Sequence, residues 1–322
     1  MSYWSEKIKI GNLEFPRFIG GPLDGITDSP FRKVVRTFSP QELLYGEMRH
    51  VGCVSHEKST QKALAFEQSE RPFTYQVSAN SLAFIEQACE KIVAAGVDCL
   101  DLNCGCPARA VVTSGSGSAL MADMPKLKLI LQAFRKNLSI PFTLKIRAGY
   151  KEKNAVEVAK LAQDCGVDAL SIHPRLQTQM FTGVPDYLLA AQVKQAVSIP
   201  VIFSGGVVNW ATAQEVYERT GVDGYLIGRG IWSRPWKLQE LSEVSQGRAF
   251  VLDHERMVQA MLEHFDNTVA YYGASSAHGV KVFRKHMPFY IKGKPTASAL
   301  RQKLVLLEDP IEVRQALVDF FT

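Results

Sequence analysis

The sequence lacks long hydrophobic runs and lacks a regular cysteine framework. A membrane-spanning helix needs about 20 consecutive apolar residues, and no stretch of the 322 residues approaches that length. Residues 1–9 are polar and charged, without the apolar core of a signal peptide. The six cysteines, at positions 53, 89, 99, 104, 106 and 165, show no disulfide spacing. We therefore expect a cytoplasmic protein with reduced thiols and no membrane association.

The sequence also has little that could hold a metal ion. Cys104 and Cys106 lie one residue apart, but no second Cys or His cluster accompanies them. A structural zinc site needs about four ligands, so we expect no metal. The net charge of +5 permits a polyanionic partner without requiring one.

What the sequence does contain is a regular alternation of short apolar runs and helical patterns. The runs are too apolar for half-exposed strands, which predicts buried parallel strands. Helical patterns start at Asn80, Asn154 and Trp210, and each ends at a glycine that stops a helix. The eight predicted strands are residues 17–22, 43–48, 73–78, 99–103, 142–147, 169–173, 201–204 and 224–227.

Eight such units in about 240 residues predict an α/β fold, a (β/α)8 TIM barrel. An open doubly wound sheet is the alternative. Beyond residue 251 no strand pattern is evident, and residues 255–272, 277–287 and 311–321 have helical patterns. We therefore predict a catalytic barrel domain over residues 1–247 and a small all-helical domain over residues 248–322.

A barrel of this kind carries its active site at the C-terminal ends of its strands. The predicted strands end in polar or glycine-rich residues at almost every position, which an inert scaffold would not need. The segments 204–206 (Ser-Gly-Gly) and 227–230 (Ile-Gly-Arg-Gly) follow the last two strands. Backbone N–H groups of such glycines can approach a phosphate, although each segment alone also suits an ordinary tight turn.

Two side chains at strand ends suggest chemistry. A lysine inside an apolar strand is costly without a partner, so Lys145 is a candidate Schiff-base nucleophile or a fixed cation beside a flavin ring. Cys106 follows its strand between a glycine and a proline, where a protonated thiol can act as an acid. Reduction of a carbon–carbon double bond requires such a proton donor opposite a hydride donor. Cys104, closer to the strand, is expected to be structural.

Several motifs together make the chain resemble the tRNA-dihydrouridine synthases, most closely the bacterial branch. No one motif is specific, but the combination extends along almost the whole chain. The matching segments are residues 22–32, 101–107, 117–120, 145–147, 227–230 and 284–286, with His173 and Arg175.

The resemblance implies FMN as prosthetic group, NADPH as reductant and tRNA as substrate. It implies that Cys106 protonates C5 of uracil while a hydride reaches C6. The implied flavin-binding residues are Pro22, Leu23, Asp24, Gln76, Asn103 and Lys145 around the ring, with Ser204, Gly205, Gly206, Gly228, Arg229 and His173 on the phosphate side. The implied RNA-binding residues are Arg175, Arg284, Lys285 and His286.

Three segments depart from the family pattern. The segment after the seventh predicted strand has Gly206 where the family has an acidic residue, Pro174-Arg175-Leu176 replaces Gly-Arg-Thr, and Leu23 replaces Met. These changes concern phosphate and RNA contacts. They leave Cys106 and Lys145 untouched.

The tail bears separately on RNA, because residues 267–307 contain no Asp or Glu. Positive charge with exposed aromatic rings suits a structured RNA, although the rings could instead pack inward. The segment contains seven basic residues, Lys281, Arg284, Lys285, Lys292, Lys294, Arg301 and Lys303, with Phe283, Phe289 and Tyr290 among them.

Other functions remain open from the residues alone. A dihydroorotate dehydrogenase-like flavoenzyme also acts on a pyrimidine C5–C6 bond, but it needs no basic tail. A flavin-free aldolase or isomerase could use Lys145 as nucleophile, and a degenerate barrel could bind RNA without catalysis. Ribosomal RNA is an alternative substrate. We expect a monomer, because RNA must reach the barrel mouth.

Overall fold

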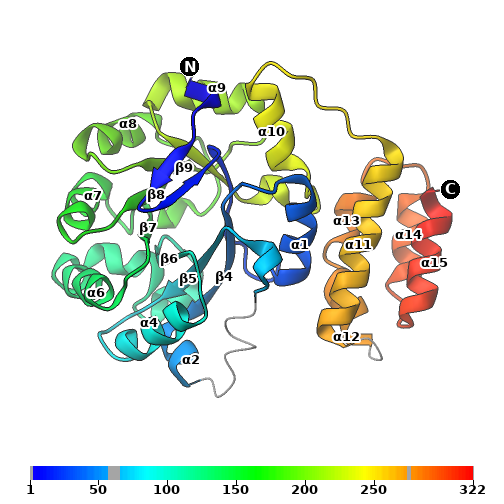
Figure 1. The fold of residues 1–322 in the computed structure, drawn as a ribbon, viewed down its shortest axis with the longest axis horizontal. Coiled ribbons are helices and arrows are strands. Elements are labelled where there is room, and N and C mark those ends of the chain that lie inside the picture. The colour runs from blue at the N-terminus through cyan, green and yellow to red at the C-terminus, as the bar shows by residue number, and fades with distance from the viewer. Residues whose placement is uncertain (1–2, 57–65, 274–276, 322) are drawn as a thin grey trace.

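The computed structural model describes residues 3–56, 66–273 and 277–321. Its centre is a closed barrel in which neighbouring strands are all parallel, in the order β10-β3-β4-β5-β6-β7-β8-β9 (Figure 1). The strands are β3 Phe18–Gly20, β4 Leu44–His50, β5 Phe73–Ser78, β6 Cys99–Cys104, β7 Phe142–Gly149, β8 Ala169–Leu176, β9 Val201–Ser204 and β10 Gly224–Ile227. The predicted TIM barrel is confirmed, and every predicted strand corresponds to an observed one.

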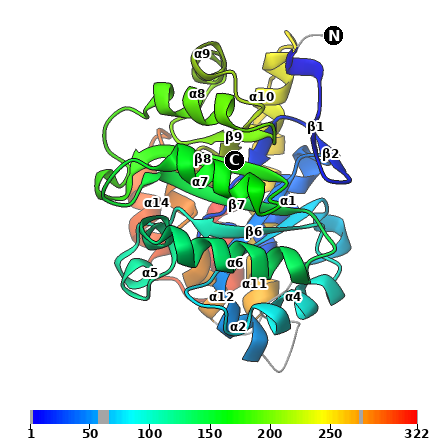
Figure 2. The ribbon, with the colours of Figure 1, turned by 90° about the vertical axis from the view of Figure 1, so that its left-hand side faces the viewer.

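Helices cover the outside of the barrel, and Figure 2 shows α6, α7 and α8 lying outside the strands. These helices are α1 Ser29–Phe38, α2 Val51–His56, α4 Ile85–Ala94, α5 Arg109–Thr113, α6 Met124–Asn137, α7 Ala155–Asp164, α8 Tyr187–Ala196, α9 Trp210–Thr220 and α10 Lys237–Ser245. The patterns at Asn154 and Trp210 predicted α7 and α9 correctly. The predicted start at Asn80 is too early, because the Asn80 amide donates to the Ser114 carbonyl (2.9 Å) and α4 begins only at Ile85.

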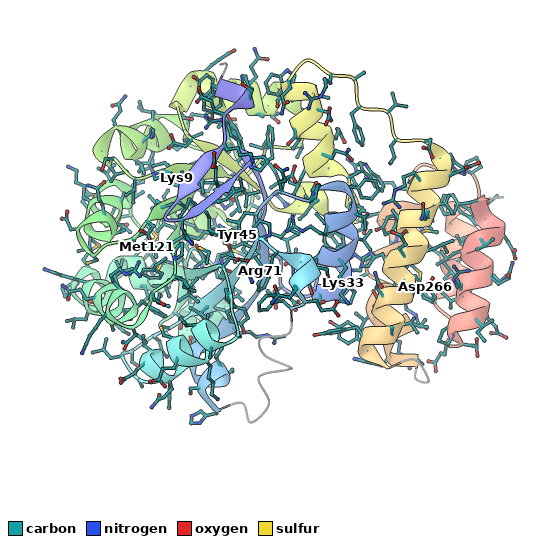
Figure 3. The ribbon with its side chains drawn as sticks, viewed as in Figure 1. Lys9, Lys33, Tyr45, Arg71, Met121 and Asp266 are labelled. Atoms are coloured by element: carbon teal, nitrogen blue, oxygen red, sulfur yellow. The ribbon has the colours of Figure 1, made fainter. Side chains whose placement is uncertain are left out.

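A short hairpin closes the N-terminal end of the barrel, and the sequence analysis did not predict it. It consists of β1 Ile8–Ile10 and β2 Leu13–Phe15, which are too short to show a clear period. Their apolar side chains pack with Tyr45, Ile202 and Leu226 from the barrel interior, and Figure 3 shows Tyr45 within the barrel. The opposite, C-terminal end of the strands is therefore the open mouth.

The helical region after the barrel has an apolar core of its own, centred on Phe265, Phe283 and Leu317. The predicted helix over residues 277–287 is divided into two, and α14 was not predicted. No helix in the described part of the chain is long and apolar enough to cross a membrane. The helices are α11 His254–Tyr272, α12 Ala277–Phe283, α13 Met287–Tyr290, α14 Ala297–Leu304 and α15 Pro310–Phe321.

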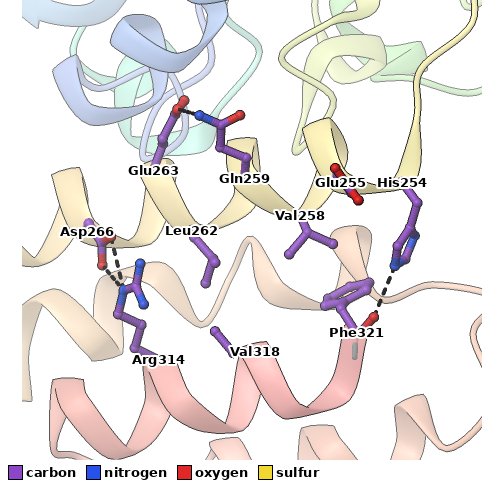
Figure 4. Close-up of a pocket in the computed structure, with 10 residues that line it drawn as sticks. All are labelled: His254, Glu255, Val258, Gln259, Leu262, Glu263, Asp266, Arg314, Val318 and Phe321. Atoms are coloured by element: carbon purple, nitrogen blue, oxygen red, sulfur yellow. Dashed lines mark hydrogen bonds and ion pairs between the residues drawn. The ribbon is translucent and has the colours of Figure 1, made fainter.

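This region lies against the barrel through α11, which packs on α1 (Figure 1). The Phe31 ring of α1 lies 5.2 Å from the His264 ring and 5.7 Å from the His286 ring, measured between centroids. A separate groove of about 420 Å³ lies between α11 and α15, with Val258 and Leu262 on its floor and the Asp266–Arg314 ion pair at one end (Figure 4). The domain boundary between residues 247 and 248 stays a prediction.

Candidate active site

The C-terminal ends of the strands carry a cluster of basic side chains. Lys145 and Arg147 lie on β7, His173 and Arg175 on β8, and Arg229 directly after β10. Burial, followed by the positive charges of the other four residues, lowers the pKa of His173 from 6.5 to about 2. His173 is therefore neutral near pH 7, among four cations. Such a cluster attracts phosphate and other anions.

Lys145 connects this cluster to Cys106. Burial, followed by the charge of Arg147, lowers the pKa of Lys145 from 10.5 to about 8, whereas Asp101 and Cys106 act in the opposite direction. The side chain stays partly accessible from the mouth. Lys145 is thus a cation below about pH 8, close enough to Cys106 for the charge of each to affect the other.

The loop after β9 forms a cradle without side chains beside the basic cluster. Gly205 and Gly206 have φ angles of +107° and +87°. A Cβ atom on Gly205 would lie 2.4 Å from His173 Cδ2 and 2.6 Å from its Nε2. Arg175 Nη1 lies 2.8 Å from His173 Nε2, and its Nη2 donates to the Gly183 carbonyl (2.7 Å). The Arg175 contact with neutral His173 implies that Nε2 accepts and Nδ1 carries the proton.

Cys106 is held by its backbone rather than by its thiol. Its N–H donates to Asn103 Oδ1 (2.7 Å), and its carbonyl accepts from the Ser118 hydroxyl (2.9 Å). Gly117 packs so closely that a Cβ there would lie 2.8 Å from the Cys106 carbonyl oxygen. Cys106 is partly exposed. Cys104 is fully buried, and burial raises the pKa of its thiol far above 9.0, so it is an unreactive core residue.

Gln76 and Asn103 contact each other on neighbouring strands. Asn103 Nδ2 donates to Gln76 Oε1 (2.9 Å), and Gln76 Nε2 donates to Asp101 Oδ2 (2.8 Å). Asp101 is completely buried and also accepts from the Thr143 hydroxyl (2.6 Å). Burial raises the pKa of Asp101 from 3.8 to about 6, so its carboxyl group is ionised at pH 7.

The loop after β3 borders the same mouth. The Leu23 N–H donates to Thr27 Oγ1 (3.0 Å), and a Cβ on Gly228 would lie 3.7 Å from Leu23 Cδ2. Leu23 therefore lies beside the loop after β10. Pro22 is partly exposed and Asp24 is exposed. Ser204 ends β9 and is almost buried. The predicted flavin-binding residues thus all lie at or next to C-terminal strand ends.

The three residues of the tail that were predicted to contact RNA differ in how exposed they are. Lys285 is partly exposed, and its Nζ would lie 3.9 Å from a Cβ on Gly25 in the loop after β3. Arg284 is half-buried, and its Nη2 donates to the Leu307 carbonyl (3.0 Å). His286 is fully buried, with Nδ1 3.2 Å from Ser233 Oγ, so its burial contradicts the predicted contact with RNA.

Two of the three tail aromatics pack inward, which is the alternative that the sequence left open. Phe283 and Tyr290 are buried in the core of the helical region, and only Phe289, 42 % exposed, is available for stacking. The aromatic period follows the inner face of the helices, which sequence alone does not distinguish from an exposed face.

For three residues of the site the sequence predicted no role. Arg147 lies two residues after Lys145 on β7, and its Nε donates to the Gly105 carbonyl next to Cys106 (2.7 Å). Alternation along a strand places it on the face of Lys145, which is a signal that could have identified it. Phe181, half-exposed in the loop after β8, lies 4.8 Å from Arg229 and 5.6 Å from Arg147. Asp101 resembled an ordinary strand residue.

Among the described residues, no three His, Cys, Asp or Glu side chains gather closely enough to hold a metal ion. What the mouth offers is an anion cradle, a partly exposed thiol and a lysine whose pKa lies near 8. This arrangement suits a phosphorylated cofactor beside an acid.

Comparison with known proteins identifies relatives along nearly the whole chain. The profile of the family described as dihydrouridine synthase matches residues 19–322. A probable tRNA-dihydrouridine synthase of Rickettsia bellii is 35% identical over 322 residues, covering 98% of both chains. tRNA-dihydrouridine synthase B of Pseudomonas aeruginosa is 33% identical over 311 residues, covering 94% of this chain and 92% of its own.

Solved structures show the same fold at much lower identity. Histamine dehydrogenase from Rhizobium sp. 4-9 superposes with a TM-score of 0.57 and 10% identity, covering 83% of this chain and 51% of its own. A variant of NCR from Zymomonas mobilis has a TM-score of 0.58 and 13% identity, covering 80% of this chain and 96% of its own. These similarities concern the barrel fold alone.

Proposed function

Because this chain belongs to the dihydrouridine synthase family, we propose that it reduces the C5=C6 bond of uridines in tRNA to 5,6-dihydrouridine, with Cys106 as proton donor. The observation that carries this proposal is the position of Cys106. Its loop is fixed to Asn103 at the barrel mouth, and its partly exposed thiol lies near Lys145 and Arg147.

The residues of the mouth fit FMN. Gly205 has no side chain, so the neutral His173 ring can pack directly against the loop after β9, and Arg229 supplies positive charge beside it. When bound, FMN supplies the hydride, and NADPH is the proposed reductant that replenishes it. The phosphate side would be held by Ser204, Gly205, Gly206, Gly228, Arg229 and His173, and the ring side by Pro22, Leu23, Asp24, Gln76, Asn103 and Lys145.

The protein's own part in the reaction is to orient uracil and to supply a proton. As a hydride arrives at C6, the electron pair of the double bond takes the thiol proton of Cys106 at C5, so one hydride and one proton are added. The thiolate left on Cys106 is stabilised by the nearby Lys145 and Arg147 cations. Solvent then returns the proton to the thiol, since Cys106 is partly exposed.

The RNA would contact both the mouth and the basic tail. Lys285 is the proposed RNA-binding residue nearest the mouth, and Arg284 lies next to it on the helical region. Arg175 is buried and donates to the Gly183 carbonyl, so we propose it for the phosphate side of the mouth instead. A uridine in folded RNA must leave its stack to enter such a site. We place the reaction in the cytoplasm and propose a monomer, because a partner over the mouth would block the RNA.

The first experiment is nucleoside mass spectrometry on RNA from cells that lack the gene. The RNA is separated into tRNA and ribosomal fractions and incubated with NADPH and purified protein, with Cys106→Ala protein alongside. We expect dihydrouridine in the tRNA fraction, and a loss of about 100-fold or more in rate with the variant, the usual effect of removing a general acid.

Dihydrouridine in the ribosomal fraction alone would assign the other RNA as substrate. A yellow, NADPH-reducible protein that forms no dihydrouridine in either fraction would contradict the proposal and favour a small pyrimidine as substrate.

A further inference from the structure

A chain of side-chain hydrogen bonds leads from a buried carboxylate to the backbone of Cys106. Gln76 Nε2 donates to Asp101 Oδ2 (2.8 Å), and Asn103 Nδ2 donates to Gln76 Oε1 (2.9 Å). Asn103 Oδ1 in turn accepts from the N–H groups of Gly105 (3.0 Å) and Cys106 (2.7 Å). We call these four links the amide relay. The two side-chain links between Asp101, Gln76 and Asn103 are buried, so water cannot replace them.

Both ends of the amide relay require the same direction. Backbone N–H groups can only donate, so Asn103 must turn its oxygen toward Gly105 and Cys106. An ionised carboxylate can only accept, so Gln76 must turn its nitrogen toward Asp101. The remaining groups, Asn103 Nδ2 and Gln76 Oε1, then face each other as donor and acceptor. One orientation of each amide satisfies every link.

We propose that Asp101 is a positioning residue that sets the direction of the amide relay and thereby holds the Cys106 loop in place. This inference deepens the proposed function, on which it rests, because it concerns the thiol proposed as proton donor. Asp101 itself is completely buried and cannot touch a substrate. Its second oxygen accepts from Thr143 Oγ1 (2.6 Å), which leaves it fixed between strands β5 and β7.

The polar layer around Asp101 explains why the carboxylate stays in place. Thr143 Oγ1 lies 3.5 Å from the Tyr45 hydroxyl, and Tyr45 is buried in the barrel interior (Figure 3). Since Thr143 donates to Asp101, its oxygen accepts from Tyr45. The carboxylate thus receives hydrogen bonds from two sides and has no freedom to turn away from Gln76.

The direction of the amide relay can be reversed by moving the carboxylate to its other end. In Asn103→Asp, an acceptor oxygen replaces the Asn103 nitrogen and faces the acceptor Gln76 Oε1. If the Gln76 amide rotates to donate to position 103, its Oε1 then faces the Asp101 carboxylate, so two acceptors still meet. In Asp101→Asn/Asn103→Asp, Gln76 can rotate, accept from the new amide at position 101 and donate to the new carboxylate at position 103, so every link is satisfied again. Asp101→Asn alone removes the negative charge at position 101 but keeps an oxygen that can accept from Gln76.

The test measures the alkylation rate of Cys106 by iodoacetamide in the full chain with its flavin bound, by peptide mass spectrometry, together with Tm. Loss of a buried link should open the loop more often, so we expect about tenfold faster alkylation of Cys106 in Asn103→Asp. The double variant should return to within about threefold of wild type. Tm should fall by about 3 °C in the single variant and recover in the double variant.

Cys53 serves as the control within the same molecule, because it is exposed in α2 and outside the relay. Its alkylation rate should be equal in all variants. Additive effects of the two substitutions, with no recovery in the double variant, would overturn the proposal. Wild-type alkylation of Cys106 in Asn103→Asp would overturn it as well.

Two single variants at position 101 distinguish the charge of Asp101 from its role as a hydrogen-bond acceptor. In Asp101→Asn, Cys106 should be alkylated at a rate near that of wild type. In Asp101→Leu, which has no acceptor at position 101, Cys106 should be alkylated as fast as in Asn103→Asp. Equal rates in Asp101→Asn and Asp101→Leu would contradict the relay. Neither readout needs RNA or NADPH, so failure here is distinct from failure to form dihydrouridine.

Discussion

Lys145 carries its charge in surroundings that disfavour it. Burial and the nearby Arg147 lower the pKa of Lys145 from 10.5 to about 8, although Asp101 and Cys106 partly offset them. Because the folded protein binds the proton more weakly than the unfolded chain, this group's contribution to stability is present above about pH 10.5. It is lost as the pH falls through about 8. At neutral pH the lysine therefore destabilises the fold.

Replacing Lys145 by Met should stabilise the flavin-free protein near neutral pH. Methionine fills a similar volume without a charge, and we expect a gain on the order of 2 kcal/mol in the free energy of unfolding, since the partly accessible ammonium is screened by solvent. Urea denaturation of the flavin-free protein from pH 7 to pH 10 checks this, because the gain should shrink toward the alkaline end. FMN affinity should fall in the same variant, and a less stable variant at pH 7 would refute the argument.

For single residues, the sequence predicts where in the fold a residue lies better than it predicts which residues it contacts. Cys106 and Lys145 could be assigned to the mouth because each lies at the end of an apolar run. The burial of His286 could not be predicted, since it depends on Ser233 and Phe31, which are distant in sequence. The role of Asp101 could not be predicted for the same reason, because its partners Gln76 and Thr143 come from neighbouring strands.

The loops that follow the strands differ in how much space surrounds their glycines. Gly205 follows β9 with φ +107° and lies against His173, whereas Gly221 ends α9 with φ +65° and has no other atom within 4 Å of the place where a Cβ would lie. Both conformations disfavour an L-residue. Only at Gly205 would a methyl group also displace a neighbour.

Gly205→Ala should therefore weaken FMN binding, while Gly221→Ala serves as the matched control. We expect Gly221→Ala to cost about 1 kcal/mol from backbone strain alone and to bind FMN normally. Gly205→Ala should displace His173 and its contact with Arg175, and should weaken FMN binding by at least about tenfold. Titration of the flavin-free proteins by flavin fluorescence compares the two, and equal affinities would show that the loop does not hold the phosphate.

The elements of the barrel were more predictable than those of the tail. Three predicted strands, 73–78, 201–204 and 224–227, coincide with β5, β9 and β10. A parallel strand buried on both faces is apolar throughout, so its run is visible without knowledge of its neighbours. The hairpin of β1 and β2 and the helix α14 are short, and their stability comes from what they pack against.

At the scale of the whole molecule, exposed basic residues occur at both ends of the fold. Arg301 and Lys303 are exposed on α14. Lys7 and Lys9 are exposed at the closed end of the barrel, Lys9 on strand β1 of the hairpin (Figure 3) and Lys7 just before it. The two pairs carry the same charge at opposite ends of the fold. Only the first pair lies on the helical region proposed to bind RNA.

Arg301→Ala/Lys303→Ala should reduce the salt dependence of tRNA binding, and Lys7→Ala/Lys9→Ala should leave it unchanged. Each phosphate contact contributes about 0.7–0.9 to the slope of log K against log salt, so the first variant should lower the slope by about 1.5. Filter binding over a series of salt concentrations measures both variants. The same slope in both variants would mean that the tail does not contact phosphate.

At this scale the sequence indicated the presence of a helical region but not its contact with the barrel. The absence of acidic residues from 267–307 is a property of the sequence itself, and its link to RNA stays a prediction. The arrangement of α11 on α1, and the burial of Phe283 and Tyr290, depend on contacts that no local pattern contains.

The seam of the barrel joins the beginning of the chain to a point some 200 residues later. β3 pairs on one side with β4, but its other side pairs with β10, through Ile19 and Leu226. During synthesis at the ribosome, the edge of β3 that pairs with β10 stays without its partner strand until β10 has been synthesised. Such an edge can pair with another chain. The architecture that creates a single mouth for chemistry thus also creates an interval of synthesis in which the nascent protein is vulnerable to aggregation.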